Sequence, residues 1–100
     1  MGTYFRRTNE SYYKLGTSYL LTVPTTPVTR LVLNTAYVAL QIANIGPSTI
    51  AYGDSSITAS SGGLLFYSMD KTWDKVKSNF EVYLIADSVA GTVIVNGYKA

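Results

Sequence analysis

Apolar and polar residues alternate along much of this chain with a period of two, which is the repeat of a β-strand. In residues 37–45, Val38, Leu40 and Ile42 share one face, and Gln41 lies on the other. Proline, glycine and serine interrupt the alternation at short intervals, as they do in all-β proteins. The predicted strands cover residues 18–23, 29–34, 37–45, 48–53, 63–67, 80–87 and 92–98.

The segments between these strands predict how the strands connect. The Gly46-Pro47 pair has the character of a hairpin tip between residues 37–45 and 48–53. Residues 88–91 are expected to close a second hairpin between the last two strands. Residues 54–62 are small, polar and almost uncharged, so they are expected to form a loop.

Residues 68–79 allow two interpretations. Met69, Trp73 and Val76 have the spacing of one helical face, which would suit a short helix. A loop or a strand around Trp73 is the alternative. We favour this alternative because strong strands flank the segment on both sides.

Together these elements predict an all-β fold, a small antiparallel β-sandwich of about seven or eight strands. The sandwich is expected to be jelly-roll-like or immunoglobulin-like and to occupy residues 17–100. Residues 1–16 are polar, rich in tyrosine and without clean alternation. They are predicted to form an N-terminal arm rather than part of the core.

Composition points to a surface that is neutral or covered by another protein. Only 14% of the residues are charged, whereas soluble domains average about 25%. The net charge of +2 is too small to indicate nucleic acid as a partner. No apolar run approaches the roughly 18 residues of a membrane span, and the first residues lack the apolar stretch of a signal peptide. We therefore expect no membrane partner and a protein that is made in the cytoplasm and does not cross a membrane.

The residue types also argue against catalysis. The chain has no cysteine and no histidine, so it lacks thiolate chemistry, the commonest general base and the commonest metal ligand. The acidic residues are scattered near predicted turns, and no motif pairs a serine with a lysine that could act as its base. The sequence therefore predicts no enzyme activity, no cofactor and no metal site.

Aromatic residues are abundant, with nine tyrosines and one tryptophan. Tyr37, Tyr52 and Tyr83 alternate with core positions and are therefore expected on outer sheet faces. They either cover the sandwich or form a protein interface, for which tyrosine is well suited. Stacking of a sugar on tyrosine or on Trp73 is a third possibility.

A series of short motifs runs in order through residues 37–98. The residues concerned are Leu40, Ile42 and Asn44, then Ile50, Tyr52 and Gly53, then Ser60 to Leu64, Trp73, Val82 to Ala86, and Gly91 to Val95. This series resembles a recurrent small β-sandwich of tailed bacteriophages. Its members occur among minor virion proteins, such as head-decoration proteins and domains of fibres or spikes.

The resemblance implies a phage virion structural protein rather than an enzyme. The first expectation is a capsid decoration (cement) protein that binds the outer head surface and bridges coat subunits. Its partners would be the major capsid protein or other virion proteins, and a homo-oligomer, in particular a trimer, is expected. Two alternatives remain: a receptor- or glycan-binding tip domain of a tail fibre or spike, and a neck or tail adaptor.

Attachment is assigned to the arm and to two aromatic residues outside it. A short arm that becomes ordered on binding can wrap around a neighbouring subunit. In the glycan-binding alternative, residues 54–62 would act together with Tyr52 and Trp73. The predicted partner-binding residues are Tyr4, Phe5, Arg6, Arg7, Tyr12, Tyr13, Tyr52 and Trp73.

Overall fold

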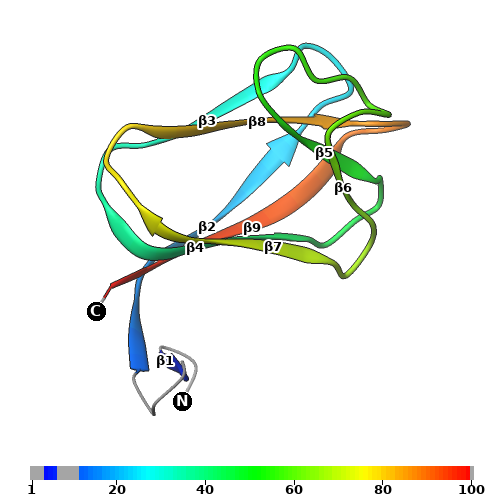
Figure 1. The fold of residues 1–100 in the computed structure, drawn as a ribbon. Helices are drawn as coiled ribbons and strands as arrows, with labels where there is room; N and C mark the ends of the chain where they lie inside the picture. Colours follow the sequence, from blue (N-terminus) through cyan, green and yellow to red (C-terminus); the bar gives the residue numbers. More distant parts are fainter. Residues whose placement is uncertain (1–3, 7–11, 100) are drawn as a thin grey trace.

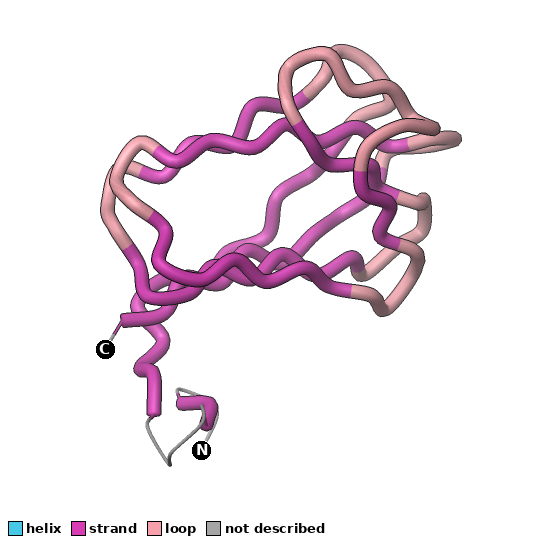
Figure 2. Tube along the Cα trace, viewed as in Figure 1, coloured by secondary structure: helices cyan, strands magenta, loops and turns pink. Residues whose placement is uncertain are grey.

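In the computed structural model, which describes residues 4–6 and 12–99, the chain forms two sheets packed face to face (Figures 1 and 2). All strand pairs are antiparallel. The strands are β1 (Tyr4–Arg6), β2 (Tyr12–Val23), β3 (Thr29–Leu33), β4 (Tyr37–Asn44), β5 (Ile50–Gly53), β6 (Gly63–Leu65), β7 (Asp70–Val76), β8 (Phe80–Ala86) and β9 (Gly91–Lys99).

The strand order identifies the type of sandwich. The first sheet has the order β1-β2-β9-β4-β7, and the second has the order β3-β8-β5-β6. From β2 onward, every connection except β5–β6 crosses from one sheet to the other. This arrangement of eight strands in two sheets is that of a jelly roll. An immunoglobulin sandwich would instead place its first two strands side by side. The predicted β-sandwich is therefore confirmed, in its jelly-roll form.

Both predicted hairpins are wrong. Strand β4 lies in the first sheet and β5 in the second, so Gly46-Pro47 turns the chain across the sandwich. Strands β8 and β9 are likewise in different sheets. Alternation shows that a strand has one inward face, but a strand in either sheet can direct that face into the core. The pattern therefore could not decide between a hairpin and a crossing.

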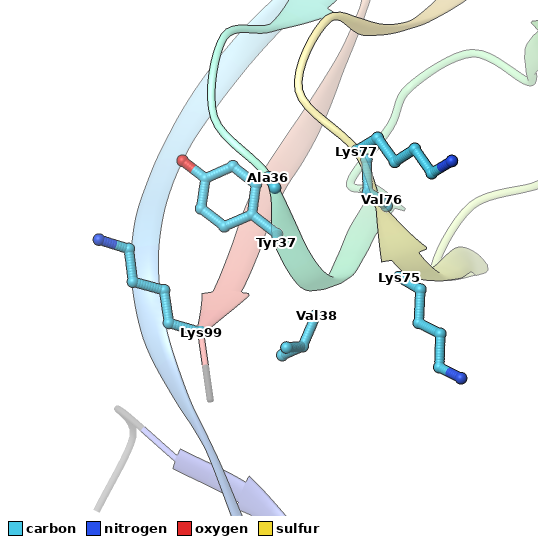
Figure 3. A pocket seen from close by; sticks show the side chains of 7 residues that line it. All are labelled: Ala36, Tyr37, Val38, Lys75, Val76, Lys77 and Lys99. Atoms are coloured by element: carbon cyan, nitrogen blue, oxygen red, sulfur yellow. The ribbon is translucent and has the colours of Figure 1, made fainter.

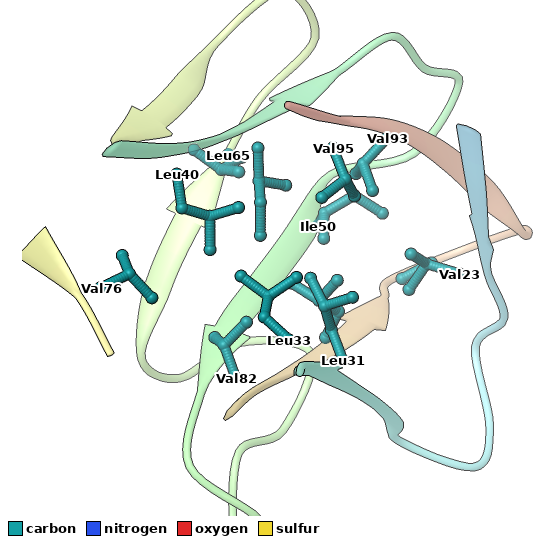
Figure 4. Close-up of a cluster of buried hydrophobic side chains, with 13 residues drawn as sticks. Val23, Leu31, Leu33, Leu40, Ile50, Leu65, Val76, Val82, Val93 and Val95 are labelled. Carbon is teal, nitrogen blue, oxygen red and sulfur yellow. The ribbon is translucent and has the colours of Figure 1, made fainter. Parts of the chain in front are cut away.

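The core lies between the two sheets and draws side chains from both (Figure 4). Burial of one such aliphatic side chain contributes about 1.5–3 kcal/mol. Strands β4 and β9 of the first sheet and β5 and β8 of the second supply eight of its thirteen buried apolar side chains. The largest fully buried apolar side chains are Leu40, Ile42, Ile50, Leu84, Val23, Val93 and Val95.

Strand β2 begins at Tyr12, six residues before the predicted start. The expected boundary between arm and sandwich, at residue 16, therefore falls inside this strand. The pairing of β2 with β9 is irregular there, between Leu15 and Thr17. Strand β1 pairs with residues Tyr12 to Lys14, and β1 and the start of β2 project beyond the sandwich as a ribbon (Figure 1).

The ambiguous residues 68–79 contain strand β7, which confirms the favoured interpretation. The strand is an edge of the first sheet and pairs with β4, with Trp73 opposite Leu40. Lys75 adopts a positive φ of 57° near the end of this strand. Val76, the next residue, is buried in the core.

Candidate binding surfaces

A buried asparagine organises the corner between β4 and β5. The side chain of Asn44 is fully buried, and its Nδ2 donates to the carbonyl oxygens of Ser48 (2.7 Å) and Leu65 (2.8 Å). Its Oδ1 accepts from the N–H of Gly46 at 2.7 Å. All three contacts are to main-chain groups, so this one amide fixes the path of the corner and ties it to β6.

Ser48 connects the same corner to the loop between β8 and β9. Its Oγ donates to the carbonyl oxygen of Val89 (2.5 Å) and accepts from the N–H of Val89 (3.0 Å). The main chain adds a bond from the N–H of Ser68 to the carbonyl oxygen of Asn44 at 2.9 Å. The corner 44–49 is thus bonded to the loops 66–69 and 87–90, which lie together on the right of Figure 2.

These three bonded loops expose five large apolar side chains, which we name the apolar end. Their exposed fractions run from 43% to 70%. Apolar side chains clustered on the surface of a soluble domain commonly mark an interaction site. The hydrogen bonds beneath them hold the surface in shape without a partner. The residues of the apolar end are Ile45, Phe66, Tyr67, Met69 and Val89.

A second aromatic group closes the sandwich on the side of β7. The rings of Tyr52 on β5 and Trp73 on β7 meet edge to face, with centroids 5.6 Å apart and an interplanar angle of 85°. Phe80 on β8 also packs on Trp73, and the centroids of these two rings are 5.6 Å apart. All three rings are half-buried and pack against the core. The group therefore joins the first sheet to the second.

These rings line a hollow of about 460 Å³, which we name the aromatic depression. Its wall also includes the loop residues Asp54 and Gly62, the first residue of β6, Gly63, and Glu81 of β8. Aromatic faces beside hydrogen-bond acceptors form a surface on which a sugar ring can stack and bond. The structure thus brings Tyr52, Trp73 and the loop 54–62 together.

The carboxylates of Asp54 and Glu81, two residues that line the aromatic depression, are already hydrogen-bonded. Hydrogen bonds from Arg30, at 2.7 and 3.0 Å, lower the pKa of Glu81. Hydrogen bonds from the side chain and the backbone of Ser56, at 2.6 and 2.9 Å, lower the pKa of Asp54. A general acid at neutral pH needs a raised pKa instead. The two groups are suited to accepting hydrogen bonds rather than to transferring protons.

Another hollow, of about 450 Å³, lies between β4, β7 and the end of β9 (Figure 3). Its floor is apolar, with Tyr37, Val38 and Val76 among the lining residues. Lys75, Lys77 and Lys99 stand around it, but their side chains point in different directions (Figure 3). The positive charges therefore do not converge on one point, as they would in an anion site.

The predicted arm residues are placed only in part. Residues Tyr4 to Arg6 form β1, and Tyr12 and Tyr13 begin β2, where Phe5 pairs with Tyr13 and Arg6 with Tyr12. These are main-chain pairings. For these five residues the structure describes the main chain and not the side chains. Arg7 lies outside the described chain entirely. The binding role of the arm remains a prediction.

The outward placement of tyrosines is correct for Tyr83, which donates to Glu81 at 3.2 Å on the outer face of β8. It is wrong for Tyr37 and Tyr52, whose rings pack against the core. Each ring lies over a glycine of a neighbouring strand, Gly97 and Gly63 respectively, where a Cβ atom would collide with it. The missing side chains leave the space into which the rings fold.

The apolar end escaped the sequence analysis. Residues 63–67 were expected to form one strand, but β6 ends at Leu65, and Phe66 and Tyr67 are exposed. A signal was present, because four consecutive apolar residues from Leu64 onward cannot all face the core from one strand.

Comparisons with protein-family models, with curated proteins and with solved structures found no match. Within the described residues, no three acidic side chains gather as metal ligands. The same part of the chain has no helix with the length and apolar character of a membrane span. The assignment of function rests on the surfaces themselves.

Proposed function

We propose that this chain is a structural protein of a phage virion, a capsid decoration protein that binds the outer head surface. The observation that carries the proposal is the apolar end. Its five exposed side chains stand on loops that are already hydrogen-bonded through Asn44 and Ser48, so little ordering is required when a partner covers them. Such a surface is suited to contact with another protein.

Bridging two coat subunits requires two separate contact surfaces. The ribbon of β1 and β2 projects from one end of the molecule, and the apolar end lies at the other (Figures 1 and 2). A protein that holds two neighbouring subunits binds the assembled shell and not the free subunits. Such binding shifts the equilibrium towards the shell by mass action.

The test is binding to heads of the phage that encodes the chain, stripped of this protein and collected by sedimentation. We expect the protein to sediment with the heads, and the double substitution Phe66→Ser and Tyr67→Ser to weaken binding at least about tenfold. Lys77→Ala, an exposed change away from the apolar end, is the matched control. A wild-type protein that stays in the supernatant would overturn the proposal.

Binding of a glycan by a fibre or spike tip domain is a second candidate. The aromatic depression favours it, because Tyr52, Trp73 and loop 54–62 line one hollow. Titration with bacterial surface saccharides, followed by the indole N–H signal of Trp73, tests it. We expect a saturable shift of this indole signal. If the sugar bonds to Asp54, Asp54→Asn should weaken the affinity for the saccharide. An unchanged indole signal with every saccharide would eliminate this candidate.

A further inference from the structure

Strand β2 has an open edge along half of its length. Strand β1 pairs with Tyr12 to Lys14, whereas β9 pairs with β2 from Lys14 to Val23. Lys14 pairs with both, so β1 and β9 flank β2 on opposite sides. From Ser18 to Val23, no strand of the described chain covers the side of β2 away from β9.

This edge lacks the features that keep sheet edges apart. Natural edges are protected by charge, proline, a bulge or short length. The other edge of the same sheet, β7, carries two aspartates and two lysines within seven residues. The edges of the second sheet are short, with five residues in β3 and three in β6. Residues 18–23 have no charge, no proline and no glycine.

Two large apolar side chains lie on this edge. Leu20 is 65% exposed and Tyr19 is 40% exposed, on opposite faces of the strand. Leu20 is paired across the sheet with Ile94 of β9, which is half-buried. A strand added beside β2 would cover apolar side chains on both faces and would also satisfy free main-chain groups.

We propose that two copies of this chain pair antiparallel along β2, about a two-fold axis at Leu20. In an antiparallel pair around a two-fold axis, the axis must pass through a residue position. At Leu20 it places Leu20 opposite the same residue of the second copy, and Tyr19 opposite Leu21. The result is one continuous sheet across the dimer.

The neutrality of the edge is the reason to choose a second copy as the partner. A two-fold axis places equivalent residues near each other, so a charged strand meets its own charges. Residues 15–29 contain no charged side chain, so no like charges oppose each other at this interface. The proposal differs from the trimer implied by the phage resemblance, and it is independent of head binding.

A single cysteine tests the register, because the chain has none of its own. Directly opposed residues of an antiparallel pair have Cβ atoms about 4.5–5.5 Å apart, close to disulfide geometry. We expect Leu20→Cys to form a covalent dimer under mild oxidation. Val89→Cys, at a similarly exposed apolar residue, is the control and should remain mostly uncrosslinked. Equal crosslinking of the two variants, or none at position 20, would overturn the proposal.

Light scattering tests the association itself. We expect the wild-type protein to have twice the 10.9 kDa mass of the chain. Leu20→Lys should halve that mass, because it places two lysines opposite each other, whereas Val89→Lys should leave it unchanged. A wild-type monomer, a trimer, or a dimer that survives Leu20→Lys would each contradict pairing through β2. Since no heads are present, this result does not depend on the decoration proposal.

Discussion

The apolar end and the aromatic depression both place aromatic rings at the surface, but they hold them differently. At the apolar end, Phe66 and Tyr67 stand on loops fixed by the hydrogen bonds of Asn44 and Ser48, and the rings are more than half exposed. In the aromatic depression, Tyr52 and Trp73 pack on each other and on the core.

This difference indicates that one set of rings stabilises the fold and the other is available for binding. Rings that pack on one another between two sheets stabilise the fold, and their removal is expected to weaken it. Rings that stand on a hydrogen-bonded frame contribute little to folding and are available to a partner. Three sets of substitutions and one change of pH test this difference, and they follow from the largest expected effect to the smallest.

Asn44→Ala is expected to have the largest effect, because it breaks the frame of the apolar end. It leaves the carbonyl oxygens of Ser48 and Leu65 and the N–H of Gly46 without their side-chain partner. We expect a loss of roughly 3–5 kcal/mol in the free energy of unfolding, measured in urea. Gln41→Ala, on a half-exposed site of the same strand, is the control. A loss below about 1 kcal/mol would show that the frame does not depend on this amide.

Trp73→Ala should destabilise the protein by roughly 2–4 kcal/mol, because the ring joins β7 to β5 and β8. Trp73→Phe keeps part of this packing and should lose less. The same urea unfolding measures both variants. Similar stability of the alanine and wild-type proteins would mean that the aromatic depression is a binding surface only. This result would contradict the stabilising role assigned to its rings.

Phe66→Ser with Tyr67→Ser should change the free energy of unfolding by no more than about 0.5 kcal/mol per site. The reason is the exposure of the two rings, 53% and 70%. The double variant should unfold at the same urea concentration as the wild type. A large loss of stability would show that these rings support the fold, and any loss of head binding by this variant would then be indirect.

Acidification should produce the smallest effect, at the exposed ion pair between Arg30 and Glu81. The hydrogen bonds from Arg30 lower the pKa of Glu81 below its ordinary value of 4.5. The ionised Glu81 therefore contributes its full share of stability above pH 4.5, and this share is lost as the pH falls through the lowered pKa. Both groups are exposed, so the change is small. Unfolding midpoints between pH 5 and about 2 should decrease less for Glu81→Gln and for Arg30→Met than for the wild type. Equal decreases would show that this pair does not contribute.

The strands could be predicted from the sequence because each one repeats a local period. Strand β8 alternates Val82, Leu84 and Ala86 in the core with Tyr83 and Ile85 outside, and nothing beyond the strand is needed to find it. The sheet to which a strand belongs is decided by non-local packing. For that reason the two crossings at residues 45–49 and 87–90 were mistaken for hairpins.

The sequence indicated some residues of the candidate surfaces but not how they come together. Tyr52 and Trp73 stood out as aromatic residues, but their contact depends on the stacking of β5 and β7 from different sheets. The burial of Asn44 had no local signal, since an asparagine two residues before a Gly-Pro pair is typical of an exposed turn. Two of its three main-chain partners, Gly46 and Ser48, are close in the sequence, but Leu65 is brought to it only by the fold.

The position of β9 between β2 and β4 has a consequence for biosynthesis. The first sheet has no centre until residues 91–99 have been made, because β2 and β4 both pair with β9 and not with each other. Contacts between residues so far apart in the sequence form slowly. We therefore expect nascent chains that stop before β9 to remain unfolded on the ribosome, with their neutral, apolar strands in need of a chaperone.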